Sequence, residues 1–456
     1  MGSLFGVLGV VREGLAAQQA AVALTGQNVA NANTPGYVRR QAILAGNAPT
    51  GGVTYQGVSR SFDQFTYSRL IGEQGKQGSA TARSNALAQL EGIVTPTSGS
   101  IGDQVDTMMA SLQALTGSPS DVATRATVLG NAQNLASSIS NTATGIEKSR
   151  DSMLSDAQRV TTDLNQSLQS IAKLNGQIAN AVASGNDASS LKDQRDQLVT
   201  DVASKIGAKT IDGDNGQVTL FAAGTTLVDG NTAASVSVQA DANNNLQFQA
   251  HRSDGTTLDI TSYVSDGSLG GIKEARDTDA TSTLNQLDQF AYDLSNAFNS
   301  VNAAGYGTDG TTGNNIFVAP TSVTGAAKAM ALDPGIVGKP QKIATSTTLA
   351  GLPGGNDNAV KLVALATAPL GATTQSPTAR FSTIAAALGT AKQSSDNEVS
   401  LRQSTVAQAQ TLNDSASGVS LDEEMTNLTQ YQRAFEASSK VLQAADELLQ
   451  NLIETL

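Results

Sequence analysis

The sequence predicts a mainly α-helical protein with an inserted β domain, in which paired terminal helices form a coiled coil beside an elongated helical body. Apolar residues recur every seven positions at both ends of the chain, which is the spacing of a coiled-coil seam. Short β-type runs interrupt long helical stretches in the middle. We expect a terminal coiled coil from residues 1–33 and 417–456, a helical body from 34–207 and 277–416, and a small inserted β domain from 208–276.

The N-terminal segment predicts an amphipathic helix with a narrow apolar seam. This helix is expected to end near Asn31, because the residue before Pro35 is biased away from helical geometry and Pro35-Gly36 favours a turn. The expected seam residues are Leu4, Leu8, Val11, Leu15, Val22 and Val29.

The C-terminal segment mirrors this pattern. Ser420 followed by Glu423 resembles a capping box, and the acidic residues 422–424 suit the positive end of a helix dipole, so the helix is expected to begin at Ser420. Because the two seams lie at opposite ends of the chain, an antiparallel pair is the economical arrangement. The expected C-terminal seam residues are Leu421, Leu428, Tyr431, Phe435, Leu442, Leu449 and Leu452.

The central helices are predicted from periodicity and from turn residues between them. Pro119 suits the first helical position after Ser118. The β-type runs are residues 210–211, 218–221, 235–238 and 246–248, with Asp-Gly and Asn-rich turns between them. The predicted central helices are Pro119–Ala183, Ser190–Ile206, Leu284–Val301 and Thr378–Leu412.

Composition excludes several classes of function. With 28 Lys+Arg against 40 Asp+Glu the formal charge is −12, which is the wrong sign for binding nucleic acid or an anionic membrane surface. The absence of Cys excludes thiolate chemistry, disulfides and Cys-ligated zinc, and no stretch has the length of a membrane span. A removable signal peptide is not expected, although an intact apolar N-terminus also fits an uncleaved export substrate.

No catalytic, cofactor or metal site is predicted. Glu423 and Glu424 are adjacent, so on a helix they point about 100° apart and cannot act as an acid/base pair. The charges at 193–196 are interpreted as surface pairs. His251 lacks a His-Glu-x-x-His context, and the acidic run 212–216 lacks the later Glu of a calcium loop.

Two motifs resemble a known family. Asn31, Asn33, Thr34, Pro35, Gly36 and Tyr37 form a segment that resembles the N-terminal signature of the rod, hook and hook-associated proteins of bacterial flagella. Arg40-Gln41, shortly after Tyr37, resembles the version of this signature found in the hook-associated protein 1 family. The additional Arg39 departs from that version. The segment 418–425, with Leu-Asp-Glu-Glu-Met, resembles the C-terminus of the same family, and the internal stretches 193–199, 267–272 and 297–299 agree with it.

The resemblance implies a secreted structural subunit that is not an enzyme and that polymerises through its terminal helices. It implies a homopolymeric ring or layer between hook and filament, needed for filament assembly and exported by the flagellar type III apparatus. The implied partners are copies of itself, hook protein, hook-associated protein 3 and an export chaperone that grips the C-terminal helix. The chain is short for this family, which implies that an outer domain is missing.

Two alternatives stay open. A hook or distal-rod protein shares the terminal heptads, and would be told apart by whether loss of the gene removes the hook as well as the filament. A secreted adhesin or binding module would place its specificity in residues 208–276, so binding by that fragment alone would support it.

Overall fold

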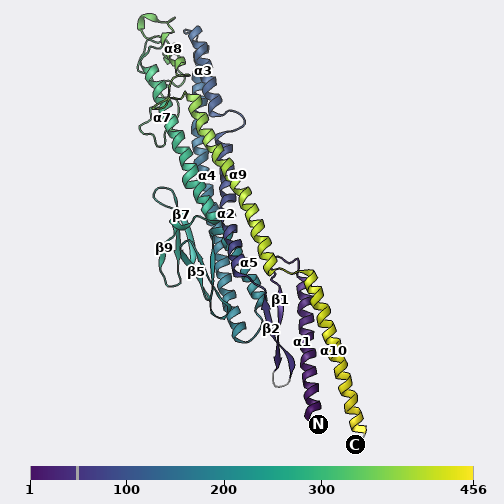
Figure 1. Ribbon diagram of the computed structural model, residues 1–456. Coiled ribbons are helices and arrows are strands. Elements are labelled where there is room, and N and C mark those ends of the chain that lie inside the picture. Colours follow the sequence, from purple (N-terminus) through teal and green to yellow (C-terminus); the bar gives the residue numbers. More distant parts are fainter. Residues whose placement is uncertain (1, 48–50, 455–456) are drawn as a thin grey trace.

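The chain doubles back on itself, so that both termini lie at the same end of a long molecule (Figure 1). The computed structural model describes residues 2–47 and 51–454. Helix α1 (Gly2–Ala30) runs from the N-terminus toward the body, and α10 (Leu421–Glu454) returns beside it in the opposite direction. The predicted fold class, with paired terminal helices, an elongated helical body and an inserted β region, is confirmed.

The limits of the terminal helices follow the predicted turn chemistry. Helix α1 ends at Ala30, one residue before the predicted stop, and α10 begins directly after Ser420. Backbone bonds from Thr34 to Asn31 and from Tyr37 to Thr34 then tighten the chain into two successive turns. The local sequence therefore determines where both helices meet the body.

A β-hairpin follows α1, and the sequence analysis did not predict it. Strands β1 (Arg40–Asn47) and β2 (Gly52–Arg60) pair antiparallel from Arg40 opposite Arg60, with a bulge between Ile43 and Leu44. The hairpin packs against α1, and Gly52 lies close to Val10. Gln, Ala and Gly residues interrupt the apolar residues of these strands, so the alternation of apolar and polar residues that marks a strand is weak.

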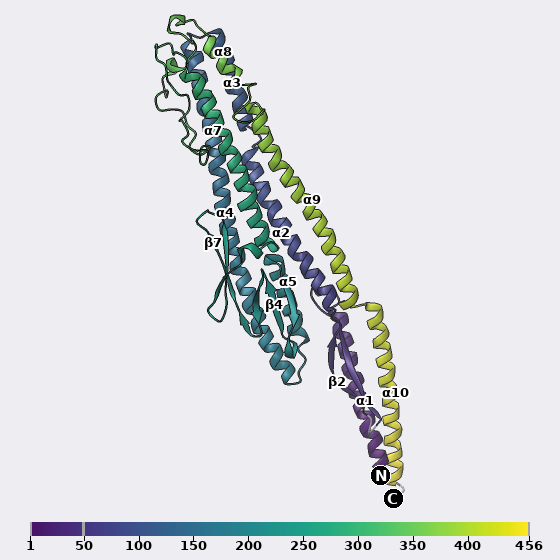
Figure 2. The same cartoon turned by 60° about the vertical axis from the view of Figure 1, so that its left-hand side comes forward.

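Long helices build the body, and α2 and α9 continue the line of the terminal pair (Figure 2). Helix α4 alone has 62 residues, which corresponds to a length of about 93 Å. The body helices are α2 (Gln64–Val94), α3 (Ile101–Gly117), α4 (Val122–Ala183), α5 (Ser189–Ile206), α6 (Gly267–Lys273), α7 (Thr281–Ala303), α8 (Asp357–Ala364) and α9 (Pro377–Ser417).

The start of α4 differs from the prediction. The helix begins at Val122, and the side chain of Asp121 caps it by accepting from the N–H of Thr124. The carbonyl of Pro119 instead accepts from Nε of the buried Arg125. The carboxylate cap satisfies helix N–H groups that Pro119 could not reach, so capping overrides the preference of proline for the first helical position.

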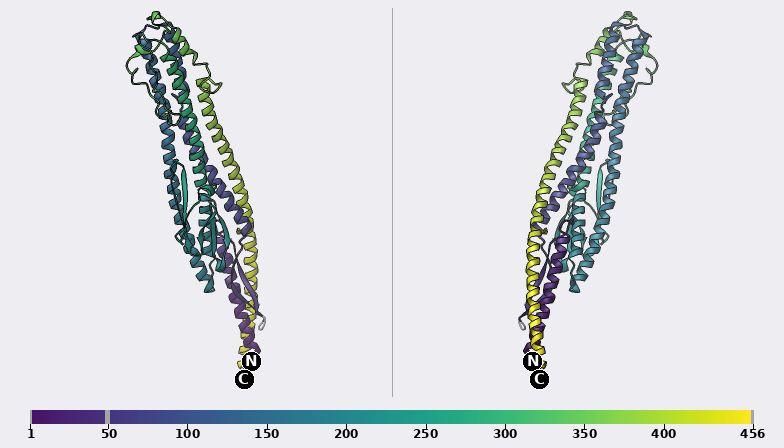
Figure 3. Two further views of the ribbon diagram at one scale, coloured as in Figure 1. Left: turned by 90° about the vertical axis from the view of Figure 1, so that its left-hand side faces the viewer. Right: turned by 90° about the vertical axis from the view of Figure 1, so that its right-hand side faces the viewer.

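Two small sheets lie against one side of α4 (Figure 3). Each is anchored by an asparagine of α4 that completes the hydrogen bonding of a strand: Asn165 pairs with both backbone groups of Val236, and Asn175 pairs in the same way with Val218. The sheets are β3–β4–β5–β6 (Lys209–Asp212, Val218–Ala222, Thr225–Asp229, Thr232–Ala233) and β7–β8–β9 (Ser235–Ala240, Leu246–His251, Thr257–Asp259).

The β region shares its core with the helices. Leu220, Val236 and Phe248 belong to the same buried apolar cluster as Leu164 of α4. Helix α6 also falls within the range 208–276 and packs on α2, where a Cβ on Gly271 would lie 2.1 Å from the carbonyl oxygen of Ser79. The strands therefore contribute to one continuous core.

The end of the body farthest from the termini includes α3, α8 and the loops between α7 and α9 (Figure 1). Arg125 holds these loops, since its guanidinium donates to the carbonyl of Ile343 at 2.6 Å and to the hydroxyl of Thr345 at 2.7 Å. Burial lowers the pKa of Arg125 to about 10. None of the described helices is both long enough and apolar enough to cross a membrane.

Candidate assembly interface

The α1–α10 pair buries a different line of α1 from the one predicted. Ala17, Ala21 and Leu24 are buried, because α1 is covered by α10 and also by the unpredicted hairpin. Of the predicted seam Val11 is buried, whereas Leu8, Leu15, Val22 and Val29 are half-buried. The side chain of Leu4 lies outside the described residues.

Helix α10 carries more apolar surface than α1 covers. Ala445 is buried, the predicted residues Leu428, Tyr431, Phe435, Leu442 and Leu449 are half-buried, and Leu421 is 52% exposed. The side chain of Leu452 lies outside the described residues. Exposed apolar side chains also occur beside this seam, at Met425, Val441 and Leu448 on α10 and at Val7 on α1. The role of the seam in assembly stays a prediction.

A buried asparagine joins the terminal pair to the body. Nδ2 of Asn28 donates to the carbonyl of Arg40 at 2.7 Å and to Oε2 of Glu424 at 3.0 Å. Its Oδ1 accepts from the hydroxyl of Tyr37 at 2.8 Å and from the N–H of Arg40 at 3.1 Å. Burial raises the pKa of Tyr37, so its hydroxyl remains protonated and can donate. A single side chain of α1 thus contacts both the following turn and α10.

Arg39 provides the second connection. Its Nε donates to Glu424 at 2.7 Å and its guanidinium also contacts Glu423 at 2.5 Å, while its N–H bonds the carbonyl of Ser417 at 2.9 Å. Burial opposes the charged form, but the bonds to Glu424 and Glu423 outweigh it and raise the pKa of Arg39. The capping role predicted for Glu423 is corrected accordingly, because its carboxylate binds Arg39.

The acidic residues of α5 form a buried ion network, which corrects their interpretation as surface pairs. Asp193 accepts from Arg40 at 3.0 Å and from Arg60 at 2.7 Å, and Arg60 also contacts Asp196 at 2.9 Å. Asp193, Asp196 and Arg195 are all more than nine-tenths buried. Burial raises the pKa of Asp193, although Arg60 and Arg40 oppose the shift. The network fixes the base of the hairpin on α5.

The family motif forms the turn between these contacts. Gly36 adopts a φ of +76°, and a Cβ there would lie 2.3 Å from Nε2 of Gln197, which donates to the carbonyl of Pro35. The hydroxyl of Thr34 bonds the side chain of Asn31, which is half-buried. Asn33 is exposed. The structure therefore brings the motifs at 31–37, 193–197 and 420–425 together at one junction, which we call the coiled-coil junction.

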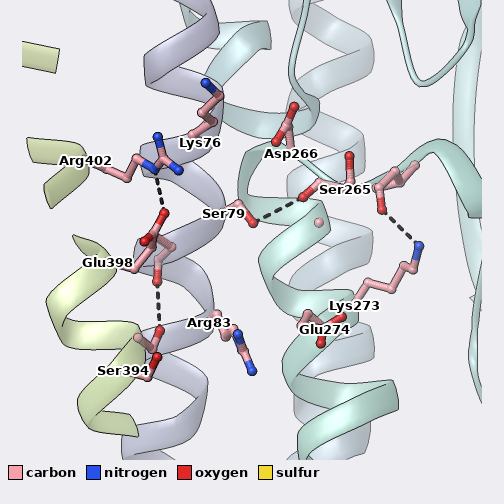
Figure 4. A pocket seen from close by; sticks show the side chains of 14 residues that line it. Lys76, Ser79, Arg83, Ser265, Asp266, Lys273, Glu274, Ser394, Glu398 and Arg402 are labelled. Carbon is pink, nitrogen blue, oxygen red and sulfur yellow. Dashed lines mark hydrogen bonds and ion pairs between the residues drawn. The ribbon is translucent and has the colours of Figure 1, made fainter. Parts of the chain in front are cut away.

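A separate polar hollow lies between α2, α6 and α9 (Figure 4). Its cations have partners within the described residues: Lys76 contacts Glu73, Arg402 contacts Glu398, and Lys273 donates to the carbonyls of Thr261 and Val264. Arg83 forms a two-pronged contact with Asp279. The hollow is polar packing between helices.

Family models match both the helical body and the two terminal segments of this chain. The family described as "Flagellar hook-associated protein FlgK helical domain" matches residues 87–317, about half of the chain. The family described as "Flagellar basal body rod FlgEFG protein C-terminal" matches residues 411–455, and the family described as "Flagella basal body rod protein" matches residues 8–37.

Full-length relatives give the same result. Flagellar hook-associated protein 1 of Salmonella typhimurium is 30% identical over 67% of this chain, although the match spans only 58% of that protein. The Bacillus subtilis protein of the same name is 28% identical over 99% of this chain and 98% of its own length. The solved structure of the flagellar hook junction protein FlgK from Burkholderia pseudomallei has the same fold, with a TM-score of 0.67 at 16% identity, covering 77% of this chain and 100% of that one.

The paired termini, the elongated body and these matches define a structural protein of the bacterial flagellar axis. Within this class, the chain belongs to the flagellar hook-associated protein 1 family, FlgK.

Proposed function

We propose that the chain is a structural subunit of the hook–filament junction, needed for filament assembly, and that it acts by polymerising through its terminal helices. The observation that carries this proposal is the α1–α10 pair, which extends beyond the body with half-buried seam residues such as Leu15 and Leu442. Fully burying one such side chain stabilises by roughly 1.5–3 kcal/mol. Neighbouring copies would supply that burial, because two thin helices cannot bury both faces of each other.

The partners are those that the family of the chain implies. The chain would form a homopolymeric ring or layer that contacts hook protein on one side and hook-associated protein 3 on the other. Export through the flagellar type III apparatus would place it outside the cell, and a chaperone at α10 would cover Val441 and Leu448 before secretion. The subunit would have no enzymatic activity.

A complementation experiment tests this function. A bacterial strain from which the gene for hook-associated protein 1 has been deleted should regain filaments when it expresses this chain. A labelled copy of the chain should lie in one narrow band where the hook meets the filament. Label along the whole hook, or loss of the hook in a null strain of the source organism, would favour the hook or distal-rod alternative. Secretion without filaments would reject the junction function.

A further inference from the structure

Phe65 is a strongly exposed aromatic side chain. It lies on the first turn of α2, just after the capping residue Asp63, and is 77% exposed. Among the large apolar side chains of the described residues that are exposed, it has the highest exposed fraction. A single exposed apolar residue is ordinary on a protein surface, so Phe65 alone indicates nothing.

A hollow lined in part by aromatic rings lies at the same level of the molecule. It has a volume of about 330 Å³ and opens between the turn at Tyr37, the start of α2 and the end of α9. Phe62 and Tyr67 form one aromatic wall, with ring centroids 5.1 Å apart. The hydroxyl of Tyr67 is bound to the carbonyl of Asp196 at 2.7 Å, so the ring is fixed in place. Aromatic rings favour such tilted neighbours.

Phe65 and the hollow lie on opposite sides of the same helix. At about 100° per residue, the lining residues Tyr67, Leu70 and Gln74 point roughly 140–200° away from Phe65. Phe65 therefore cannot enter its own hollow. A contact between opposite sides of one subunit joins copies head to tail, and such contacts close into rings or continue as helices.

We propose that Phe65 of one copy inserts into the hollow of the next copy in the assembled layer. This inference rests on the proposed function, because it presumes that the copies lie side by side. The occupant is a second copy because each subunit presents an exposed ring and a hollow with aromatic walls at one level. The hollow is also continuous with the coiled-coil junction, where Tyr37 and Gly36 contribute to both.

Paired cysteines test the contact directly, since the chain contains no native cysteine. In a F65C/Q74C variant the two Cα atoms of one chain are separated by about 13.5 Å along α2, whereas a disulfide needs roughly 4.4–6.8 Å. Any disulfide must therefore join different copies. Flagella purified from a complemented null strain and oxidised should give a ladder of linked multimers. The matched control is V122C/Q74C, because Val122 is 65% exposed but begins α4, three residues before the Arg125 that holds the loops at the far end of the body.

Two further variants test the energetics. Phe65→Ser, which removes an exposed side chain and should leave the fold intact, is expected to weaken association on the order of tenfold or more, seen as fewer filaments per cell. Gln74→Trp should fill the hollow and have the same effect, whereas Gln74→Ala should not. Full filament numbers in Phe65→Ser would count against the contact.

The outcomes separate this contact from the junction function. Filaments restored by F65C/Q74C without a ladder would overturn the Phe65 contact and leave the junction function standing. If the wild-type chain restores no filaments, the proposed function fails. The contact would then be judged on concentrated purified F65C/Q74C protein, where a ladder supports it and monomer alone rejects it.

Discussion

Asn28 and Glu424 are hydrogen-bonded at 3.0 Å although 396 positions separate them in the chain, and both side chains are buried. This bond connects the end of α1 to the first turn of α10. Both helices are thin and extend beyond the body, so their orientation depends on contacts at this point. The coiled-coil junction is therefore where changes should alter the terminal pair and leave the body folded.

The first prediction concerns Asn28. Asn28→Ala removes the partner of Tyr37, of Glu424 and of both backbone groups of Arg40, and a buried polar group left unpaired costs about 1–3 kcal/mol. We expect a loss of this size in urea unfolding followed by circular dichroism, and faster proteolysis between α1 and β1. Asn33→Ala is the matched control: Asn33 is exposed in the same motif, so its change should be within about 0.5 kcal/mol. Equal effects would reject the role of Asn28.

The second prediction compares two adjacent carboxylates that bind the same arginine. The side chain of Glu424 is 2% exposed and that of Glu423 is 61% exposed. Glu424→Ala leaves Arg39 without its buried partner and should cost about 3 kcal/mol of unfolding free energy. Glu423→Ala removes a solvated contact and should cost between about 0 and 1 kcal/mol of unfolding free energy. Salt should reduce this cost. A larger effect at Glu423 would contradict the assignment of burial.

The third prediction concerns the ion network on α5. Asp193→Ala removes a carboxylate that Arg40 and Arg60 share, and both arginine side chains are largely covered. We therefore expect a loss of about 3–5 kcal/mol in unfolding free energy and increased hydrogen exchange in β1 and β2. Asp156→Ala serves as the control, since its pair with Arg159 is largely exposed and should contribute at most about 1 kcal/mol. An unchanged hairpin in Asp193→Ala would show that the network does not hold it.

The sequence predicted the elements whose signals are local. Heptad spacing predicted the terminal helices, the Pro35-Gly36 turn predicted the end of α1, and Ser420 predicted the start of α10. The hairpin escaped prediction because its strands contain small and polar residues, and its apolar contacts come from α1. The buried line on α1 moved to Ala17, Ala21 and Leu24 for the same reason, since the heptad pattern could not anticipate a second covering element.

The coiled-coil junction could not be predicted as a unit, although its motifs could be recognised separately. Arg39 and Glu424 are 385 positions apart, and Arg60 and Asp193 are 133 apart. No periodicity links such positions, and charged residues near one another on a helix usually lie at the surface. Their burial depends on how α5 and the hairpin pack, which only the structure reveals. Phe65 was also missed, because exposure of one apolar residue leaves no mark in the sequence pattern.

The fourth prediction uses the pKa of Tyr37, which burial raises above the ordinary value of 10.0. A group with a raised folded-state pKa contributes its full stabilisation below the unfolded-state value and loses it as the pH rises through the folded-state value. The difference in unfolding free energy between wild type and Tyr37→Phe should therefore be constant from neutral pH to about 10 and shrink above it. Urea unfolding across this range measures the difference, and a constant difference at all pH values would refute the role of the hydroxyl.

The last prediction tests the assembly seam. Leu442 is half-buried on the side of α10 that carries the heptad residues, and neighbouring copies are proposed to complete its burial. Leu442→Asp places a charge where burial is required, at a cost of several kcal/mol per contact, so filaments should be absent from a complemented null strain. Gln443→Asp is the matched control, because it introduces the same charge one residue further on an exposed side of the same helix.

Secretion of both Leu442→Asp and Gln443→Asp must be measured, so that failed export is not mistaken for failed assembly. Circular dichroism of the purified variants should show an unchanged helical body, because Leu442 lies in the terminal pair and contributes nothing to the core of α2, α4, α7 and α9. The decisive result is secreted, folded Leu442→Asp protein with no filaments beside normal filaments for Gln443→Asp. Normal filaments in both strains would show that copies do not meet along this seam, and the polymerising surface would then have to be sought on the body.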